Sequence, residues 1–209
     1  MKNSFRLLTE LSGNKENLQA LLFLTLGSKY LNLTHNALEE TVNSGNVHMV
    51  VSDGNLSWDE YFQKTKWSDF FIIEPVLFCF YHGLELTLKG LILLVDSKEV
   101  KPVHSISGLY KRLSTLKKVP EDIKKIIGKY VTENNDSMVS GFLTENKKDI
   151  DGLYESLRYP ADKDFQSLNS YFKFHYQEEE ALEECKEILL DIRTLQSHGT
   201  KFYRTCIQG

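Results

Sequence analysis

The sequence predicts an all-α protein folded as an up-and-down helical bundle, on three observations. Apolar residues recur at spacings of three and four along most of the 209-residue chain, which is the period of amphipathic helices. Helix-capping residues and short polar connections separate these periodic stretches. One stretch, residues 70–95, is apolar on nearly every side, so we expect it to be a central helix that the other helices cover.

The polar positions of this central helix fall in one narrow sector. At ~100° per residue, Glu74, His82, Glu85 and Lys89 share a face, and Glu85 to Lys89 is the favourable order for an i,i+4 ion pair. A charge in mid-segment costs about 2.5–3.5 kcal/mol on insertion scales, so the helix is not expected to cross a membrane. We interpret the sector as a wet seam of structural pairs, with a catalytic seam as the alternative.

Composition is that of an ordinary globular domain, and the charge is unevenly distributed along the chain. Hydrophobic residues make up 41% and charged residues 26% of the chain, and the net charge is −4. Residues 98–129 nevertheless carry nine Lys or Arg against three acidic residues. This basic segment either meets a phosphate backbone or forms solvated helix faces, and both interpretations remain open. No zinc spacing, Gly-rich phosphate loop or nucleophile elbow is present, so neither a metal nor another cofactor is expected.

The cysteines and the N-terminus indicate the compartment. Cys79, Cys185 and Cys206 are widely spaced, which suggests inert thiols in a reducing environment. The first 30 residues lack the pattern of a signal peptide. We therefore expect a cytoplasmic protein.

Before the central helix, a helix is expected over residues 14–42, with Gly27 as a break or kink. Residues 46–56 alternate in polarity as a strand does, so a short hairpin and an irregular loop are both open. Ser57 and Glu60 then form a capping box that opens a short helix ending near Trp67.

After the central helix, Ser105 is the expected N-cap of one helix and Pro120 the first residue of the next. A helix over residues 138–158 should be interrupted at Gly141 and Gly152 and end near Arg158, because Pro160 disfavours helix before it.

The C-terminal part begins with residues 161–176, which are aromatic. We interpret them as a strap over the bundle, with a base-stacking surface as the alternative. A last helix is expected over residues 178–198, closed by Gly199 and followed by a tail.

Three motifs occur in a fixed order along the chain: YHGLELTLKGL at residues 81–91, HSISGLY at 104–110 and YESLRYP at 154–160. Together they resemble the HEPN superfamily (higher eukaryote and prokaryote nucleotide-binding domain) over roughly residues 70–200. The resemblance implies a bundle of four to five helices that forms a homodimer through long helices. Residues 1–69 would then be an N-terminal helical extension packed on the bundle, residues 70–200 the bundle, and residues 201–209 a C-terminal tail.

The resemblance also implies a function. It indicates a module that binds RNA, a nucleotide or a protein partner in a prokaryotic defence, toxin–antitoxin or stress system, with no membrane involved. A purely structural helical adaptor remains an alternative. Many relatives are metal-independent endoribonucleases with an R-x(4–6)-H signature, and Arg193 and His198 match it. His198 would act as acid or base and Arg193 as phosphate clamp, so whether the chain is an enzyme stays open.

The geometry of that pair sets a condition on catalysis. Five residues apart, Arg193 and His198 project ~140° from each other on an ideal helix. They converge only if the helix loosens or a second chain contributes. Otherwise they are ordinary cations at the end of a helix.

The remaining candidate residues are assigned to ligand binding. Arg158 either contacts a ligand phosphate or bonds the last carbonyls of its helix, and His104 either binds a ligand or packs. The full set of candidates is His82, Glu85, His104, Lys111, Arg112 and Arg158.

Overall fold

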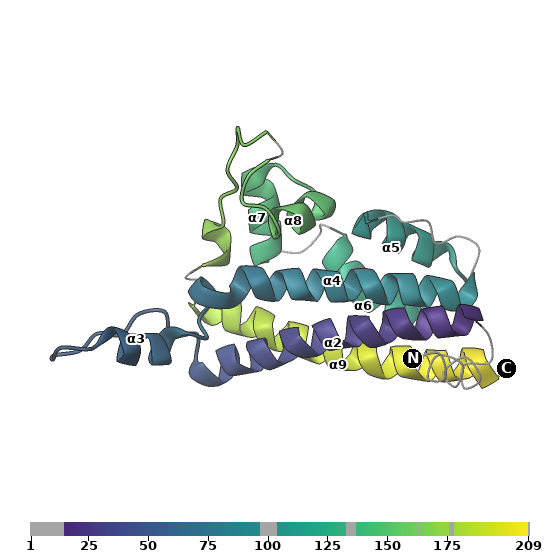
Figure 1. The fold of residues 1–209 in the computed structure, drawn as a ribbon, viewed down its shortest axis with the longest axis horizontal. Coiled ribbons are helices and arrows are strands. Elements are labelled where there is room, and N and C mark those ends of the chain that lie inside the picture. The colour runs from purple at the N-terminus through teal and green to yellow at the C-terminus, as the bar shows by residue number, and fades with distance from the viewer. Residues whose placement is uncertain (1–14, 97–103, 133–136, 163, 176–177, 209) are drawn as a thin grey trace, which may run out of the picture. The chain divides into compact units, whose positions relative to one another are not determined.

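The computed structural model describes residues 15–96, 104–132, 137–162, 164–175 and 178–208. Its elements are α2 (Lys15–Ser44), α3 (Trp58–Thr65), α4 (Asp69–Val95), α5 (Ile106–Thr115), α6 (Glu121–Val131), α7 (Met138–Asn146), α8 (Ile150–Ser156), the 3-10 turn η1 (Phe172–Phe174) and α9 (Glu178–Gln208) (Figure 1). The predicted all-α class is confirmed. Residues 46–56 contain no strand, so the irregular loop is the correct alternative for them.

The chain divides into two compact units. Unit 1 holds α2 up to Leu31, α4 from Tyr81, α5, α6 and α9 from Arg193. Unit 2 holds the other parts of α2, α4 and α9 together with α3, α7, α8 and η1. The expected division into an extension (1–69) and a bundle (70–200) stays a prediction.

Helix α4 is the buried central helix that its composition predicts. Leu84, Leu88 and Leu91 have no exposed surface. By length and hydropathy α4 could cross a membrane, but 83% of its most apolar 18-residue window is buried by the protein itself. That degree of burial is typical of a core helix, since the surrounding protein takes the place of lipid.

In unit 1, α2 and α4 pack closely and run antiparallel. A Cβ built on Gly27 would lie 2.9 Å from Thr87 Oγ1, whereas one on Gly90 would lie 2.6 Å from Leu24. A contact nearer the C-terminus of α4 therefore pairs with a residue nearer the N-terminus of α2, as in antiparallel helices. One expectation was a break at Gly27, but α2 continues through this residue. Gly27 instead allows the two helices to approach closely, because it has no side chain.

Local sequence sets most helix starts. The Ser57 hydroxyl accepts from Glu60 N and the Glu60 side chain accepts from Ser57 N, which confirms the capping box. Ser105 caps α5 by accepting from Gly108 N. Pro120 is the N-cap of α6 and not its first helical residue, a shift of one position.

The break between α7 and α8 falls at polar residues and not at the predicted glycines. Lys147 takes a left-handed conformation (φ 52°) at the end of α7, and the Asp149 side chain accepts from Gly152 N to start α8. Gly141 and Gly152 lie inside these helices. Helix α8 ends at Ser156, two residues earlier than expected.

Helix α9 does not end at His198, so the prediction of Gly199 as a terminal residue and of residues 201–209 as a tail is wrong up to Gln208. The apolar stripe continues past the glycine: Leu195 is 2% and Phe202 is 7% exposed. Continued burial outweighs the cost of one glycine within a helix, which is about 1 kcal/mol.

Only part of the aromatic segment, around Tyr171 and Phe174, packs as the predicted strap, and it does so within unit 2. Phe174 is fully buried and stacks on Phe142 at a centroid distance of 4.8 Å. The Tyr171 hydroxyl donates to Ser156 O at 2.6 Å. Phe165 and Phe172 are exposed, so base stacking by these two rings stays a prediction.

Two glycine substitutions test the helix contact. Gly27→Ala should lower the free energy of unfolding by about 1–3 kcal/mol, because its Cβ would overlap Thr87. Gly199→Ala is the matched control, since a Cβ there meets nothing within 4 Å, and it should raise the free energy of unfolding by about 0.5–1 kcal/mol. Urea unfolding followed by circular dichroism measures both. Equal effects of the two substitutions would contradict the close approach.

Candidate functional site

The candidate site in unit 1 is built around the buried carboxylate of Glu85, which is 2% exposed. Lys89 Nζ donates to Glu85 Oε1 at 2.7 Å. His104 Nδ1 lies 3.1 Å from the same oxygen, and His82 Nδ1 lies 3.3 Å from Oε2. One carboxylate thus holds three groups that are cationic or can become so, and we call these four residues the Glu85 cluster.

Helix geometry and one cap position these groups. Lys89 is one turn after Glu85 on α4 and His82 is nearly one turn before it, so both share its face. His104 directly precedes Ser105, the N-cap of α5, so the start of this helix fixes the position of the imidazole. The ring of Tyr30, from α2, meets the His82 ring edge-on at 4.5 Å.

The prediction of a wet seam is therefore wrong for Glu85 and Lys89. Lys89 is 7% exposed, and the predicted ion pair forms inside the protein. The seam is covered because His104 lies against it on one side and Tyr30 packs on His82. A buried carboxylate of this kind is stable only with its cation in place, because both charges have lost water.

The histidines connect this buried charge to the surface. The His104 side chain is 75% exposed and that of His82 is 26% exposed. Each ring turns Nδ1 to the carboxylate, so on the exposed His104 ring Nε2 is the nitrogen turned away from Glu85. A ring held this way can accept a proton and then donate a hydrogen bond to an anion such as a phosphate oxygen.

The two basic candidates on α5 differ in their surroundings. Arg112 forms an ion pair with Asp96, just after the end of α4. Lys111 is exposed. Arg112 thus ties α5 to α4, while Lys111 is placed to meet solvent or a ligand.

Arg158 belongs to unit 2, whereas the Glu85 cluster belongs to unit 1. It is exposed, and its guanidinium lies 4.9 Å from the ring centroid of Tyr154 and 5.7 Å from that of Tyr159. The described contacts of Arg158 are with these two rings and not with the last carbonyls of its helix, and the phosphate contact stays a prediction. Stacking on aromatic rings holds the side chain instead.

Arg193 and His198 both lie on α9 in unit 1. Arg193 is exposed and His198 is half-buried. Helix α9 is continuous through both residues, so it does not loosen between them. The ~140° separation of an ideal helix therefore holds within one chain, and a joint site would need a second chain.

The thiols do not form a reactive centre. Burial first, and then Glu184 and Asp69, raise the pKa of Cys185 to about 12. Burial also raises the pKa of Cys79 and Cys206. All three stay protonated near neutral pH and are poor nucleophiles. Within the described ranges, no three His, Cys, Asp or Glu residues are arranged to hold a metal ion.

Some partners of the site could not be found from sequence. Tyr30 and Asp96 have no local signal, because they reach His82 and Arg112 from other segments of the chain. The same holds in unit 2, where His175 Nε2 lies 2.7 Å from Glu74 Oε1. These pairings depend on which helices become neighbours, which periodicity alone does not specify.

These observations define an all-α helical protein whose most apolar helix carries a buried Glu–Lys pair and whose next helix begins beside it with a histidine. A family model for the HEPN domain matches residues 72–196, more than half of the chain, and the chain belongs to this family. The match covers the Glu85 cluster and Arg193 and ends two residues before His198. No curated protein matches, and no solved structure matches either.

Substitutions at the ion pair test whether Glu85 is compensated as described. Glu85→Gln should lower the free energy of unfolding by about 3–5 kcal/mol, because it leaves the buried Lys89 ammonium without a carboxylate. The double variant Glu85→Leu/Lys89→Met removes both charges and should lose less, measured by urea unfolding. Equal losses in the two variants would show that the pair is not buried in solution.

Proposed function

We propose that this protein binds RNA or a nucleotide through phosphate contacts at the Glu85 cluster and the adjoining surface of α5. The observation that carries the proposal is the exposed His104 ring, whose inner nitrogen is held by a buried carboxylate. HEPN domains are associated with nucleotides and RNA, which supports this ligand class. His104 and Lys111 are the residues that we expect to meet phosphate, while Glu85, Lys89 and His82 orient His104.

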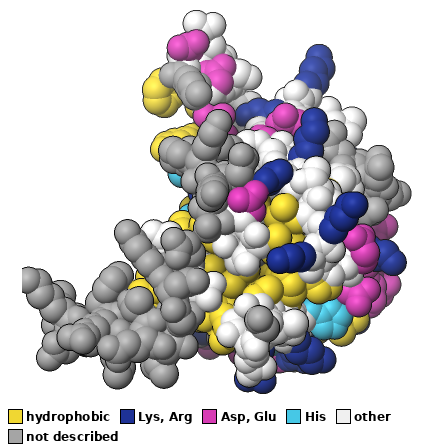
Figure 2. Space-filling model, turned by 90° about the vertical axis from the view of Figure 1, so that its right-hand side faces the viewer, with side chains coloured by type: hydrophobic (Ala, Val, Ile, Leu, Met, Phe, Trp, Pro, Cys, Tyr) yellow, Lys and Arg dark blue, Asp and Glu magenta, His cyan; other side chains and the backbone are white. Residues whose placement is uncertain are grey.

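The charge around this site supports the same ligand class. Lys117, Lys118 and Lys125, in and between α5 and α6, are exposed together with Lys111. Figure 2, which views the side where α5 and the end of α9 lie, shows Lys and Arg side chains spread over this face among acidic and exposed hydrophobic ones. Such a distribution attracts a phosphate backbone without specifying its sequence.

The setting of this activity follows from the family. We infer a cytoplasmic protein of a prokaryotic defence, toxin–antitoxin or stress system that works as a homodimer or with a protein partner. The burial of α4 by the rest of the chain is consistent with this setting.

A binding assay tests the proposal with a fluorescein-labelled single-stranded RNA and a labelled ATP analogue as probes. Lys111→Ala should weaken RNA binding and lower the salt slope of log K by about 1, as the loss of one phosphate contact does. His104→Ala should weaken RNA binding as well, because it removes the exposed imidazole that we expect to contact phosphate. Fluorescence anisotropy measures both effects.

The matched control is Lys64→Ala, which removes an exposed lysine of α3 in unit 2. It should leave affinity and salt slope unchanged. Binding by neither probe, or equal weakening by the control, would reject the proposed site. A folded protein that binds neither probe would favour the structural adaptor.

A second candidate function is metal-independent RNA cleavage by Arg193 and His198. The exposure of Arg193 on a family-typical long helix favours it. Because α9 is regular between the two residues, Arg193 of one chain would have to clamp the phosphate for His198 of another. The proposal therefore requires a dimer with α9 near its axis.

Cleavage is tested with RNA in the presence of EDTA. If the pair is catalytic, wild type should cleave, and His198→Ala should lose about 10²–10⁴-fold in rate, the usual contribution of a general acid or base. Gel analysis of end-labelled RNA measures the rates. Cleavage that survives His198→Ala, or no cleavage by wild type, would remove this candidate for the RNA used.

A further inference from the structure

The chain between α2 and α4 of unit 2, residues 47–68, is closed at its base by hydrogen bonds. The buried Asn46 side chain donates to Asp69 Oδ2 at 3.1 Å and accepts from Asp69 N at 2.7 Å. The Tyr61 hydroxyl donates to His48 O at 2.9 Å and so ties α3 to the loop before it. Figure 1 shows this segment extending beyond the end of α2 and the start of α4. The segment is thus held in a defined conformation.

Five aromatic rings form a continuous row from α3 onto the start of α4. Trp58 stacks on Tyr61 at a centroid distance of 5.6 Å. Phe62, one turn after Trp58, meets Phe71 edge-on at 5.7 Å, and Phe71 meets Phe70 at 5.1 Å. We call these five residues the aromatic row.

The aromatic row is open to solvent. Trp58 is 69%, Phe70 is 42% and Phe62 is 40% exposed. Throughout residues 39–72, all of which the structure describes, no hydrophobic side chain is buried. The core therefore does not account for these rings. Exposed aromatic side chains, Trp above all, are typical anchors of protein–protein contacts because they offer a large, rigid apolar area.

The charges beside the row indicate the kind of partner. Asp59 is exposed and lies ~60° from Phe62 around α3, whereas Lys64 lies ~160° from Phe62. Glu74, one turn after Phe70, places a second carboxylate at the other end of the row, where it pairs with His175. Carboxylates at both ends repel a phosphate backbone or an anionic membrane and attract Lys or Arg side chains.

We propose that the aromatic row docks a basic amphipathic helix of a partner protein. The ring centroids repeat at 5.1–5.7 Å along the row. Side chains one turn apart on a helix are also about 5–6 Å apart, so an apolar ridge of the partner helix matches this spacing. The rings supply the apolar contact, and Asp59 and Glu74 orient the helix by meeting its Lys or Arg side chains.

The inference gives a surface and a chemistry to the protein partner proposed above, and it rests on that part of the proposed function alone. The row belongs to unit 2, whereas the Glu85 cluster belongs to unit 1. All five rings also precede residue 72, where the family match begins. The surface is therefore a feature of this chain outside the matched domain.

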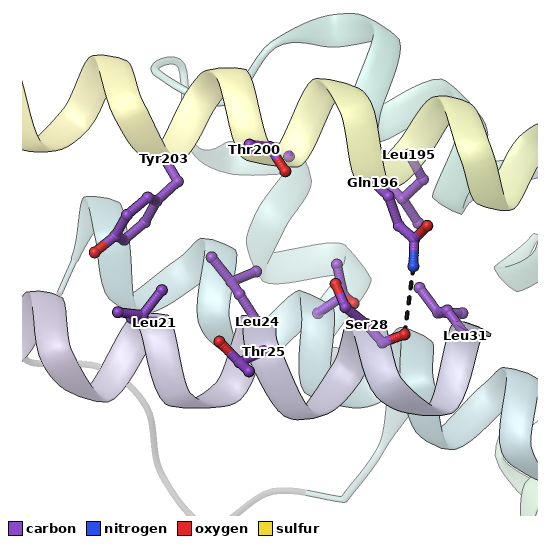
Figure 3. Close-up of a pocket in the computed structure, with 11 residues that line it drawn as sticks. Leu21, Leu24, Thr25, Ser28, Leu31, Leu195, Gln196, Thr200 and Tyr203 are labelled. Atoms are coloured by element: carbon purple, nitrogen blue, oxygen red, sulfur yellow. Dashed lines mark hydrogen bonds between the residues drawn. The ribbon is translucent and has the colours of Figure 1, made fainter. Parts of the chain in front are cut away.

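An uncharged recess in unit 1 provides a comparison. It lies between α2 and α9, and none of its eleven lining residues carries a charge. Figure 3 shows Tyr203 beside Leu21 at one end of this recess. Tyr203 is half-buried and offers aromatic contact without neighbouring carboxylates. It is therefore the matched residue for separating charge recognition from apolar contact.

Fluorescence anisotropy of the full chain with two labelled model peptides tests the inference. One is a peptide of about 18 residues made of Leu and Lys with the leucines at helical spacing, and the other has Glu in place of every Lys. Wild type should bind the Lys peptide at least about tenfold more tightly than the Glu peptide. Trp58→Ala should weaken binding of the Lys peptide at least about tenfold, as the loss of a central aromatic anchor does.

Charge reversal gives a second readout. Asp59→Lys should weaken binding of the Lys peptide and strengthen binding of the Glu peptide, because it reverses the charge beside Phe62. Both substituted side chains are exposed, so thermal unfolding followed by circular dichroism should match wild type.

Tyr203→Ala and Lys111→Ala are the controls, and both should leave peptide binding unchanged. Failure of the Glu85 site alone would appear as a protein that binds the Lys peptide but not RNA. Equal binding of the two peptides, no binding of either, or equal weakening by Tyr203→Ala overturns the inference. Loss of RNA binding or of self-association in Trp58→Ala assigns the row to nucleic acid or to a second copy, and overturns it as well.

Discussion

The structure of unit 1 depends on one buried charge, the Glu85 carboxylate in the most apolar helix of the chain. Removing a carboxylate from water costs several kcal/mol unless cations and hydrogen bonds replace the solvent. Lys89 supplies the cation from the same helix, and the two histidines satisfy the remaining positions. His104 directly precedes α5, so its contact with Glu85 also fixes the position of the start of α5 beside α4. The group that stabilises the core is thus the group that presents a histidine to solvent.

A second constraint, the close approach of α2, completes the cluster. Glycine at positions 27 and 83 lets the two backbones come near, as the 3.2 Å from a built Gly83 Cβ to Gly27 O indicates. Tyr30 lies on the same side of α2 one turn beyond Gly27, and there it meets His82. Helix α2 lies outside the family match, yet it contributes to the surroundings of the site. The part of α2 around Gly27 and Tyr30 therefore helps to shape the candidate site.

How much could be predicted from sequence follows from how local each interaction is. The central helix, the Glu85–Lys89 pair and the caps at Ser57 and Ser105 depend on spacings of three or four residues, so periodicity and cap rules reach them. Contacts between distant segments, such as Tyr30 with His82, depend on the packing of whole helices and leave no such pattern. Gly199 was misinterpreted for a different reason. A glycine can mark the end of a helix, but it can also lie within a helix where no side chain is packed. Only the continuation of the apolar pattern to Phe202 distinguishes the two cases.

The two candidate sites differ in what a single chain can supply. The Glu85 cluster is complete within one chain, because α4 and the start of α5 bring all its groups together. Arg193 and His198 project to different sides of a regular helix, so no rotation of side chains unites them in one chain. Phosphate binding is therefore a property that the monomer can have, whereas cleavage by this pair can arise only from assembly.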